Sequence, residues 1–226
     1  MFDILLQIDS TKAATELLSQ KSESVWGVLA KGGLLMIPLL SLLVIAIFFF
    51  IERYITISKA AKIEENFMSI IRDNIVTGNV TAARSLAKNT NNPGAKVIDK
   101  GIQRIGKPID AIEKSMDNVG VLEMYKLEKN LSIISIIARI APLFGFLGTI
   151  IGMLALFKGI AATSEYTPNT IADGIYIKMI TSATGLIIGI LAYLGHSFLQ
   201  AQIARIENKI DAASAEFVDI LQEPTR

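Results

Sequence analysis

The sequence predicts an all-α membrane protein with three transmembrane helices, of which the second and third are long and extend into a cytoplasmic helical domain. Three uncharged apolar runs predict the spans: residues 34–51 and 140–157 hold 18 residues each, and residues 179–199 hold 21. A helix of roughly 17–25 apolar residues crosses the hydrocarbon core of a bilayer. The chain is 51% hydrophobic and 19% charged, which is too apolar for an ordinary soluble domain and too charged for a chain lying wholly in lipid.

Composition excludes several classes of function. The net charge of +1 offers no basic field for nucleic acid. The chain has no Cys and one His, so a thiolate or multi-histidine metal site within one chain is excluded. There is no nucleophile–base pair and no phosphate-binding loop. We therefore expect no enzyme activity, no cofactor, no metal and no nucleic-acid partner.

The N-terminal part is expected outside the cytoplasm. Residues 1–33 are predicted to form a periplasmic amphipathic segment, in which Trp26 suits the membrane interface. Residues 1–9 lack the basic start and the unbroken apolar run of a signal peptide. Residues 52–131 hold 13 Lys and Arg, whereas residues 1–33 hold three and residues 159–173 hold none. The positive-inside rule therefore places the N-terminus in the periplasm and residues 52–131 and the C-terminus in the cytoplasm.

The following elements are predicted in order. The first transmembrane helix covers residues 34–51, and residues 52–131 form a cytoplasmic helical domain in which Asn79 is a helix N-cap. Pro108 opens the next helix, and no Pro follows until Pro142. We expect one unbroken helix from Ile109 to Phe157, roughly 75 Å long. Transmembrane helix 2 then covers residues 132–158, a periplasmic loop residues 159–173, transmembrane helix 3 residues 174–199 and a cytoplasmic C-terminal helix residues 200–226.

Small and hydroxyl residues follow helical spacing in the second and third spans. The candidates for helix packing are Gly145, Gly148, Gly152, Gly185 and Gly189, and two pairs of them form GxxxG. Small residues let membrane helices approach closely, so one interpretation is tight packing alone. The other interpretation is a polar path for protons, whose candidate lining residues are Thr149, Thr181, Ser182 and Lys178.

Lys178 precedes the third uncharged run. If the span starts there, Lys178 marks the outer boundary of the membrane. If the helix opens near Pro168, Lys178 lies a few turns deep, and an ionisable residue inside a membrane indicates a functional site. The sequence leaves both positions open.

Three segments resemble the ExbB/TolQ/MotA proton-channel family. The first is LEKNLSIISIIARIAPLFGFLGTIIGMLALF, with its A-P-x-x-G-x-x-G-T-x-x-G-M core. The others are GNVTAARSLAKNTNNPGAKVIDKGIQRIG and GIYIKMITSATGLIIGI, and Glu52-Arg53 closes the first span in the same way. Three spans with an outside N-terminus resemble ExbB and TolQ more than MotA, which has four, and the chain is most like ExbB.

The resemblance implies a homopentamer in the bacterial inner membrane, with helices 2 and 3 around a pore. It implies an ExbD- or TolR-like single-span partner with an intramembrane Asp, and a TonB- or TolA-like energy transducer. Thr149 matches the family's pore Thr, and Ser182 matches its third-helix hydroxyl. One position departs from the pattern: Ile177 stands where relatives carry Glu, and Lys178 follows it. The partner's Asp is therefore expected to be the obligatory protonatable carboxylate.

Three functions fit this pattern. The first is an ExbB-like subunit of a proton-driven motor that energises TonB-dependent transport across the outer membrane. The second is a TolQ-like subunit of the Tol-Pal envelope-integrity system. The third is a non-conducting scaffold that only assembles single-span partner helices.

Overall fold

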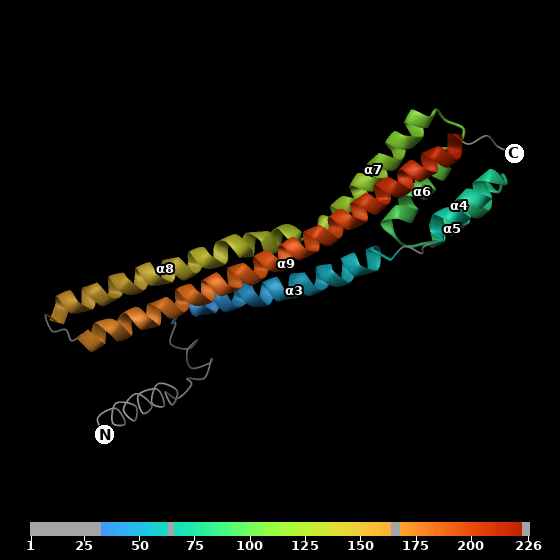
Figure 1. Ribbon diagram of the computed structural model, residues 1–226. Helices are drawn as coiled ribbons and strands as arrows, with labels where there is room; N and C mark the ends of the chain where they lie inside the picture. The colour runs from blue at the N-terminus through green and yellow to red at the C-terminus, as the bar shows by residue number, and fades with distance from the viewer. Residues whose placement is uncertain (1–32, 63–65, 164–167, 223–226) are drawn as a thin grey trace, which may run out of the picture. The chain divides into compact units, whose positions relative to one another are not determined.

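The computed structural model describes residues 33–62, 66–163 and 168–222, and every regular element in them is an α-helix (Figure 1). The helices are α3 (Met36–Ala60), α4 (Phe67–Val76), α5 (Val80–Asn89), α6 (Pro93–Ile102), α7 (Ile109–Glu128), α8 (Leu131–Thr163) and α9 (Pro168–Gln222). The predicted all-α fold is confirmed. The predicted segment of residues 1–33, except its last residue, lies outside the described residues, and so does Trp26.

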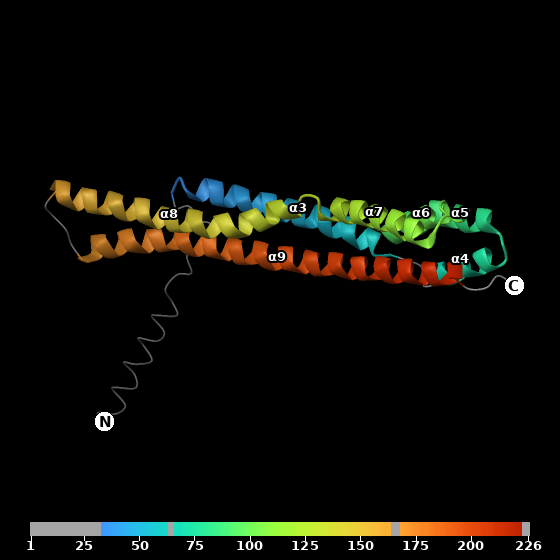
Figure 2. The same cartoon turned by 90° about the horizontal axis from the view of Figure 1, so that it is seen from above.

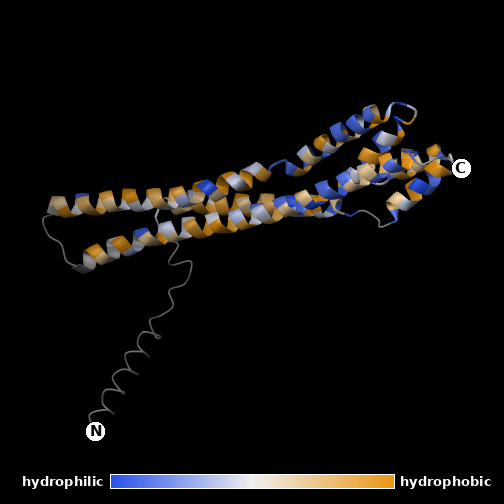
Figure 3. Ribbon diagram, turned by 45° about the horizontal axis from the view of Figure 1, so that its top comes forward, coloured by the Kyte–Doolittle hydropathy of each residue, from blue (hydrophilic) through white to orange (hydrophobic). Residues whose placement is uncertain are grey.

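Three helices are long and apolar enough to cross a membrane, as predicted. The helices that contain a sufficiently long apolar stretch are Met36–Ala60 in α3, Leu131–Ala162 in α8 and Gly174–Gln222 in α9. Large apolar side chains on them, such as Phe48, Leu143 and Leu186, are exposed. Figure 3 shows mostly apolar residues along α8, whereas hydrophilic residues are more frequent on α4 to α7. Helices that are apolar all round suit a lipid environment.

The described chain forms two compact units. The first unit contains the start of α3 up to Leu40, α8 from Pro142 onward and α9 up to Leu186. Figures 1 and 2 both show α8 and α9 running side by side in this unit. The second unit contains the rest of α3, α4 to α7, the start of α8 and α9 from Ile187 onward.

The predicted unbroken helix from Ile109 to Phe157 is wrong at one place. Helix α7 ends at Glu128, and α8 begins at Leu131. Between them, Lys129 has an extended ψ of 135°, and Asn130 has a φ of 65°. This left-handed conformation is tolerated by Asn because its short polar side chain can form local hydrogen bonds. The carbonyl of Asn130 then accepts the Ile133 N–H at 3.2 Å, which starts α8.

Asparagine caps begin two helices of the second unit. The side chain of Asn79 accepts the Ala82 N–H at 3.2 Å, which confirms the predicted N-cap of α5. Asn92 accepts the Ala95 N–H at 2.6 Å and begins α6. Pro93 follows directly, and Pro is tolerated in a first turn because the N–H that it lacks has no helical partner there.

The end of α9 packs into the core of the second unit. Its buried side chains recur at helical spacing and are Leu199, Ile203, Ile206, Ile210, Phe217 and Ile220. A Cβ atom at Gly101 of α6 would lie 2.6 Å from the ring of Phe217 and 2.7 Å from the sulfur of Met116 on α7. Gly101 is therefore the residue that lets α6, α7 and α9 meet in this core.

Candidate functional site

Helices α8 and α9 approach each other closely at Gly145, which is buried. A Cβ atom there would lie 3.1 Å from the Cα and O atoms of Ser182 and 3.1 Å from the O atom of Thr181. These are backbone atoms, so they cannot turn aside as the end of a side chain can. Close backbone contact at a small residue is a principal way in which helices attract each other in lipid.

A second contact lies one turn further along α8. A Cβ atom at Gly148 would lie 2.8 Å from the Cγ2 methyl of Thr181. Thr181 is only 1% exposed. The methyl group of Thr181 therefore fills the space that the missing side chain of Gly148 leaves.

The third contact involves Lys178. A Cβ atom at Gly152 would lie 2.0 Å from Cδ, 2.3 Å from Cε and 2.5 Å from Cγ of Lys178. The aliphatic stem of Lys178 therefore lies across α8 at Gly152. Helix α9 begins at Pro168, six residues before the predicted start of the span, so Lys178 lies within a continuous helix and does not begin it.

These three contacts form one antiparallel line, which we call the glycine seam. Its members are Gly145, Gly148 and Gly152 on α8 and Ser182, Thr181 and Lys178 on α9. Gly185 and Gly189 are also buried, further along α9. The seam brings together three of the predicted packing residues and three of the four predicted polar-path residues.

Thr149, the fourth predicted polar-path residue, lies beside Gly148 on α8. Its hydroxyl donates to the Phe146 carbonyl at 2.7 Å. On α9, the hydroxyl of Thr184 donates to the Ile180 carbonyl at 2.8 Å in the same manner. Such back-bonding satisfies a hydroxyl in lipid, and its oxygen can still accept a further hydrogen bond. The geometry is thus compatible with packing alone and with a polar path.

The second unit holds an ion-pair cluster that the sequence did not indicate as a site. Glu123 on α7 is buried and accepts from the ammonium groups of Lys96 at 2.9 Å and Lys126 at 2.5 Å. Burial by itself would raise the pKa of Glu123, but the hydrogen bonds from Lys126 and Lys96 outweigh it, and the pKa lies below the usual range. In the sequence, the only local indication of this cluster is the spacing of three positions between Glu123 and Lys126, which suits an ion pair along a helix.

Arg53 joins α3 to α7 in the same unit. Its side chain is buried, pairs with the neighbouring carboxylate of Glu52, and donates to the Lys126 carbonyl at 3.3 Å. A buried guanidinium needs such partners because leaving it unpaired costs several kcal/mol. Arg53 thereby ties α3, just beyond its uncharged apolar run, to the last turn of α7.

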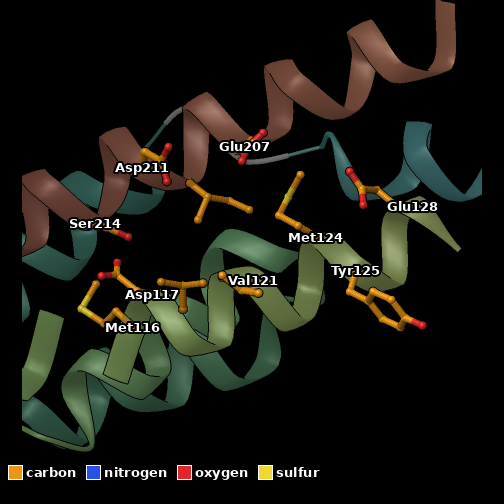
Figure 4. A pocket seen from close by; sticks show the side chains of 12 residues that line it. Met116, Asp117, Val121, Met124, Tyr125, Glu128, Glu207, Asp211 and Ser214 are labelled. Atoms are coloured by element: carbon orange, nitrogen blue, oxygen red, sulfur yellow. The ribbon is translucent and has the colours of Figure 1, made fainter. Parts of the chain in front are cut away.

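A hollow of about 470 Å³ lies between α7 and α9 in the second unit. Figure 4 shows Glu207, Asp211 and Ser214 on α9 facing Met116, Asp117 and Val121 on α7. Carboxylates surround apolar side chains in this hollow, with no basic residue among the lining. Within the described part of the chain, no group of three or more His, Asp or Glu could hold a metal ion.

A comparison with protein families matches residues 89–212 to the MotA/TolQ/ExbB proton channel family. This match covers more than half of the chain and includes α6, α7, α8, most of α9 and the whole glycine seam.

Individual relatives agree with this match. The chain is 37% identical over 90 residues to biopolymer transport protein exbB1 of Vibrio cholerae, which is 39% of this chain and 40% of that protein. It is 28% identical over 120 residues to a putative ExbB homolog of Methanothermobacter thermautotrophicus, 53% of this chain and 41% of the relative. It is 26% identical over 137 residues to Tol-Pal system protein TolQ of Haemophilus influenzae, 61% of this chain and 56% of the relative. The chain thus spans less than two thirds of the length of each of these relatives.

Proposed function

The chain belongs to the MotA/TolQ/ExbB proton channel family, and on that basis we propose that it is a multi-pass inner-membrane subunit of a proton-driven motor. In this proposal the subunit couples the proton-motive force to biopolymer transport. The glycine seam is the observation that carries the proposal, because it places the buried Thr181 and the ionisable Lys178 between two apolar helices. Polar groups at such a place are expensive and mark ion pathways.

We favour an ExbB-like role in TonB-dependent transport over a TolQ-like role in the Tol-Pal system. The relative with 37% identity is named a biopolymer transport protein, whereas the Tol-Pal relatives are 26% and 29% identical. Complementation separates the two roles: the chain should restore TonB-dependent uptake in a strain lacking ExbB. Restoration of envelope integrity alone in a strain lacking TolQ would favour the second role.

The proposed assembly is a homopentamer around the helices of an ExbD- or TolR-like single-span partner. A TonB- or TolA-like protein would carry the energy onward. In this proposal the N-terminus lies in the periplasm, and α4 to α7 and the C-terminus lie in the cytoplasm. The family supports an assembly of this kind, whereas the glycine seam packs α8 against α9 within one chain.

The proposed proton site combines this chain with its partner. The membrane-spanning part of α8 contains no Asp or Glu, so we assign the protonatable carboxylate to the partner's helix. Thr149, Ser182 and Thr181 would position its proton, because a hydroxyl can donate and accept without holding a charge in a medium of low dielectric.

Proton flux in liposomes tests this proposal. The chain is reconstituted with its single-span partner, and flux is measured under an imposed membrane potential. Replacing the partner's intramembrane Asp by Asn should abolish proton flux. Thr149→Ala in this chain should lower proton flux while the complex still assembles. Thr184→Ala is the matched control, because Thr184 is another back-bonded hydroxyl in the spans. Full flux in the Asn variant would overturn the proton route, and no flux in the wild-type complex would favour the non-conducting scaffold.

A further inference from the structure

Lys178 lies opposite the inner part of an uncharged run. The run covers residues 140–157 of α8, between Arg139 and Lys158. The stem of Lys178 crosses α8 at Gly152, which is six residues before Lys158 and thus about 9 Å from it along the helix axis. The position of Lys178 is therefore inside the apolar layer of α8, and the structure favours the deeper of the two positions that the sequence left open.

The direction of the Lys178 side chain also decides whether its ammonium group can reach the membrane surface. A lysine near a membrane surface usually extends along its own helix toward the headgroups. Here Cγ, Cδ and Cε all lie against Gly152 of the neighbouring helix. The stem is thus directed sideways into the seam, where Gly152 has no side chain to obstruct it.

Neither α8 nor residues 174–199 of α9 contain a carboxylate that could pair with Lys178. Helix α8 has no acidic residue. Residues 174–199 of α9 likewise contain no Asp or Glu. A charged group in lipid is costly and is normally paired.

We propose that the ammonium group of Lys178 binds one carboxylate carried on a membrane-spanning helix of another chain. The proposal rests on the proposed function in one respect, namely that a single-span partner is present in the complex. The carboxylate would lie next to the ammonium group, at the edge of the glycine seam, and would be held ionised there by the ammonium charge. Lys178 thereby sets the depth and the rotation at which the partner helix docks.

A lipid phosphate could supply the same negative charge, but its depth does not fit. Phosphates lie at the membrane surface, outside the hydrocarbon layer, and the lysine stem is about 9 Å inside the charged end of α8 at Lys158. A carboxylate on a spanning helix can reach that depth. The test therefore uses neutral lipid in one arm and anionic lipid in the other.

Binding of a synthetic helix provides the experiment. The probe is a leucine-rich single-span peptide with one Asp at its midpoint, and the matched probe has Asn there. The full chain is placed in phosphatidylcholine nanodiscs, and binding is followed by energy transfer between labels. We expect the Asp probe to bind about tenfold more tightly than the Asn probe, the scale of a polar contact between membrane helices.

Variants of Lys178 show whether the ammonium is responsible. Lys178→Met keeps a stem of similar length over Gly152 and should bind both probes equally. Lys178→Arg keeps the charge and should retain the preference for Asp. Infrared bands of an isotope-labelled Asp carboxyl should show the ionised form with wild type and the protonated form with Lys178→Met. Equal binding of both probes to wild type, or an unchanged Asp preference in Lys178→Met, would overturn the proposal.

The binding assay is run in neutral and in anionic lipid, and without a proton gradient. It can therefore fail for reasons that differ from those that would refute the proposed function. If phosphatidylglycerol abolishes the Asp preference, the site binds lipid phosphate, and the proposal fails. The binding assay needs no proton flux. A chain that binds the Asp probe through Lys178 but conducts no protons would refute the proposed function and leave this inference standing.

Discussion

A side chain at Gly145 would be tightly packed, because backbone atoms of Ser182 and Thr181 lie 3.1 Å from the position of its missing Cβ. Gly152 differs, since the atoms that approach it belong to the flexible stem of Lys178. The two glycines therefore have different roles. Gly145 sets the distance between α8 and α9, and Gly152 makes space for a side chain.

Gly145→Leu should destabilise the chain more than any exposed substitution on the same helix. Overpacking in a tight contact costs about 1–3 kcal/mol, and here the obstructing atoms are backbone. Ala155→Leu is the control, because Ala155 is exposed on α8. The midpoint of denaturation in detergent measures the effect. Equal midpoints for the two variants would show that the contact at Gly145 does not hold the helices together.

Glu123 should make the stability of the second unit depend on acidity. Its pKa is below the usual range in the folded chain because Lys126 and Lys96 overcome the effect of burial. A carboxyl with a lowered folded pKa stabilises above its unfolded pKa of about 4.3. That contribution is lost as the pH falls through the folded pKa.

Glu123→Gln should therefore cost about 1 kcal/mol near neutral pH, since both lysines are partly exposed and screened. The difference from wild type should shrink as the pH falls below about 4.3. Glu113→Gln is the control on the exposed side of α7. Denaturation curves at several pH values measure both variants, and a difference that grows on acidification would contradict the assigned ion pairs.

At the scale of elements, the junction between α7 and α8 departs from the helical pattern. Apolar periodicity continues through it, and no Pro or Gly marks it. The break comes from two residues, Lys129 and Asn130, whose backbone leaves the helical region. The result is that the polar helix α7 and the apolar helix α8 are separate elements.

Substitution of Asn130 tests this junction. Asn130→Gly should keep the stability, because Gly adopts a positive φ without strain. Asn130→Ala should cost about 1–2 kcal/mol, the penalty of a left-handed conformation for an ordinary residue. Asn118→Ala, at an exposed position inside α7, should be neutral or slightly stabilising. A more stable Asn130→Ala variant with increased helix content would show that the two helices prefer to be one.

At the scale of the whole molecule, apolar exposure and charge lie on different parts of the chain. The described residues of α8 carry two charges, Arg139 and Lys158, whereas α7 carries charges along its whole length. The positive-inside rule then gives the direction of insertion that we propose. The chain has no native Cys, so single cysteines can report that direction.

Lys114→Cys, at an exposed position of α7, should resist a membrane-impermeant maleimide in intact spheroplasts and react after lysis. Lys158→Cys, exposed near the end of α8, should react in intact spheroplasts and serves as the control. Mass spectrometry of the labelled chain measures both. Labelling of Lys114→Cys before lysis would mean that the chain is inserted the other way.

The sequence by itself determined the fold class, the three apolar helices, the cap at Asn79 and the family. These features depend on local composition and spacing: an apolar run of sufficient length, a cap residue before a helix, and a motif read along the chain. The buried stripe on the end of α9, with Ile203, Ile206 and Phe217, was also readable, because its period matches a helix.

Only the tertiary structure decided which glycine faces which residue, and that the stem of Lys178 lies against Gly152. Helical periodicity reports a face of one helix but not the register between two helices, so the pairing of Gly152 with Lys178 could not be predicted. The ion pair of Glu123 with Lys96 could not be predicted either, because the two residues are 27 positions apart and lie on different helices. The break at Asn130 also escaped prediction, because a single residue's left-handed conformation leaves the apolar pattern unchanged.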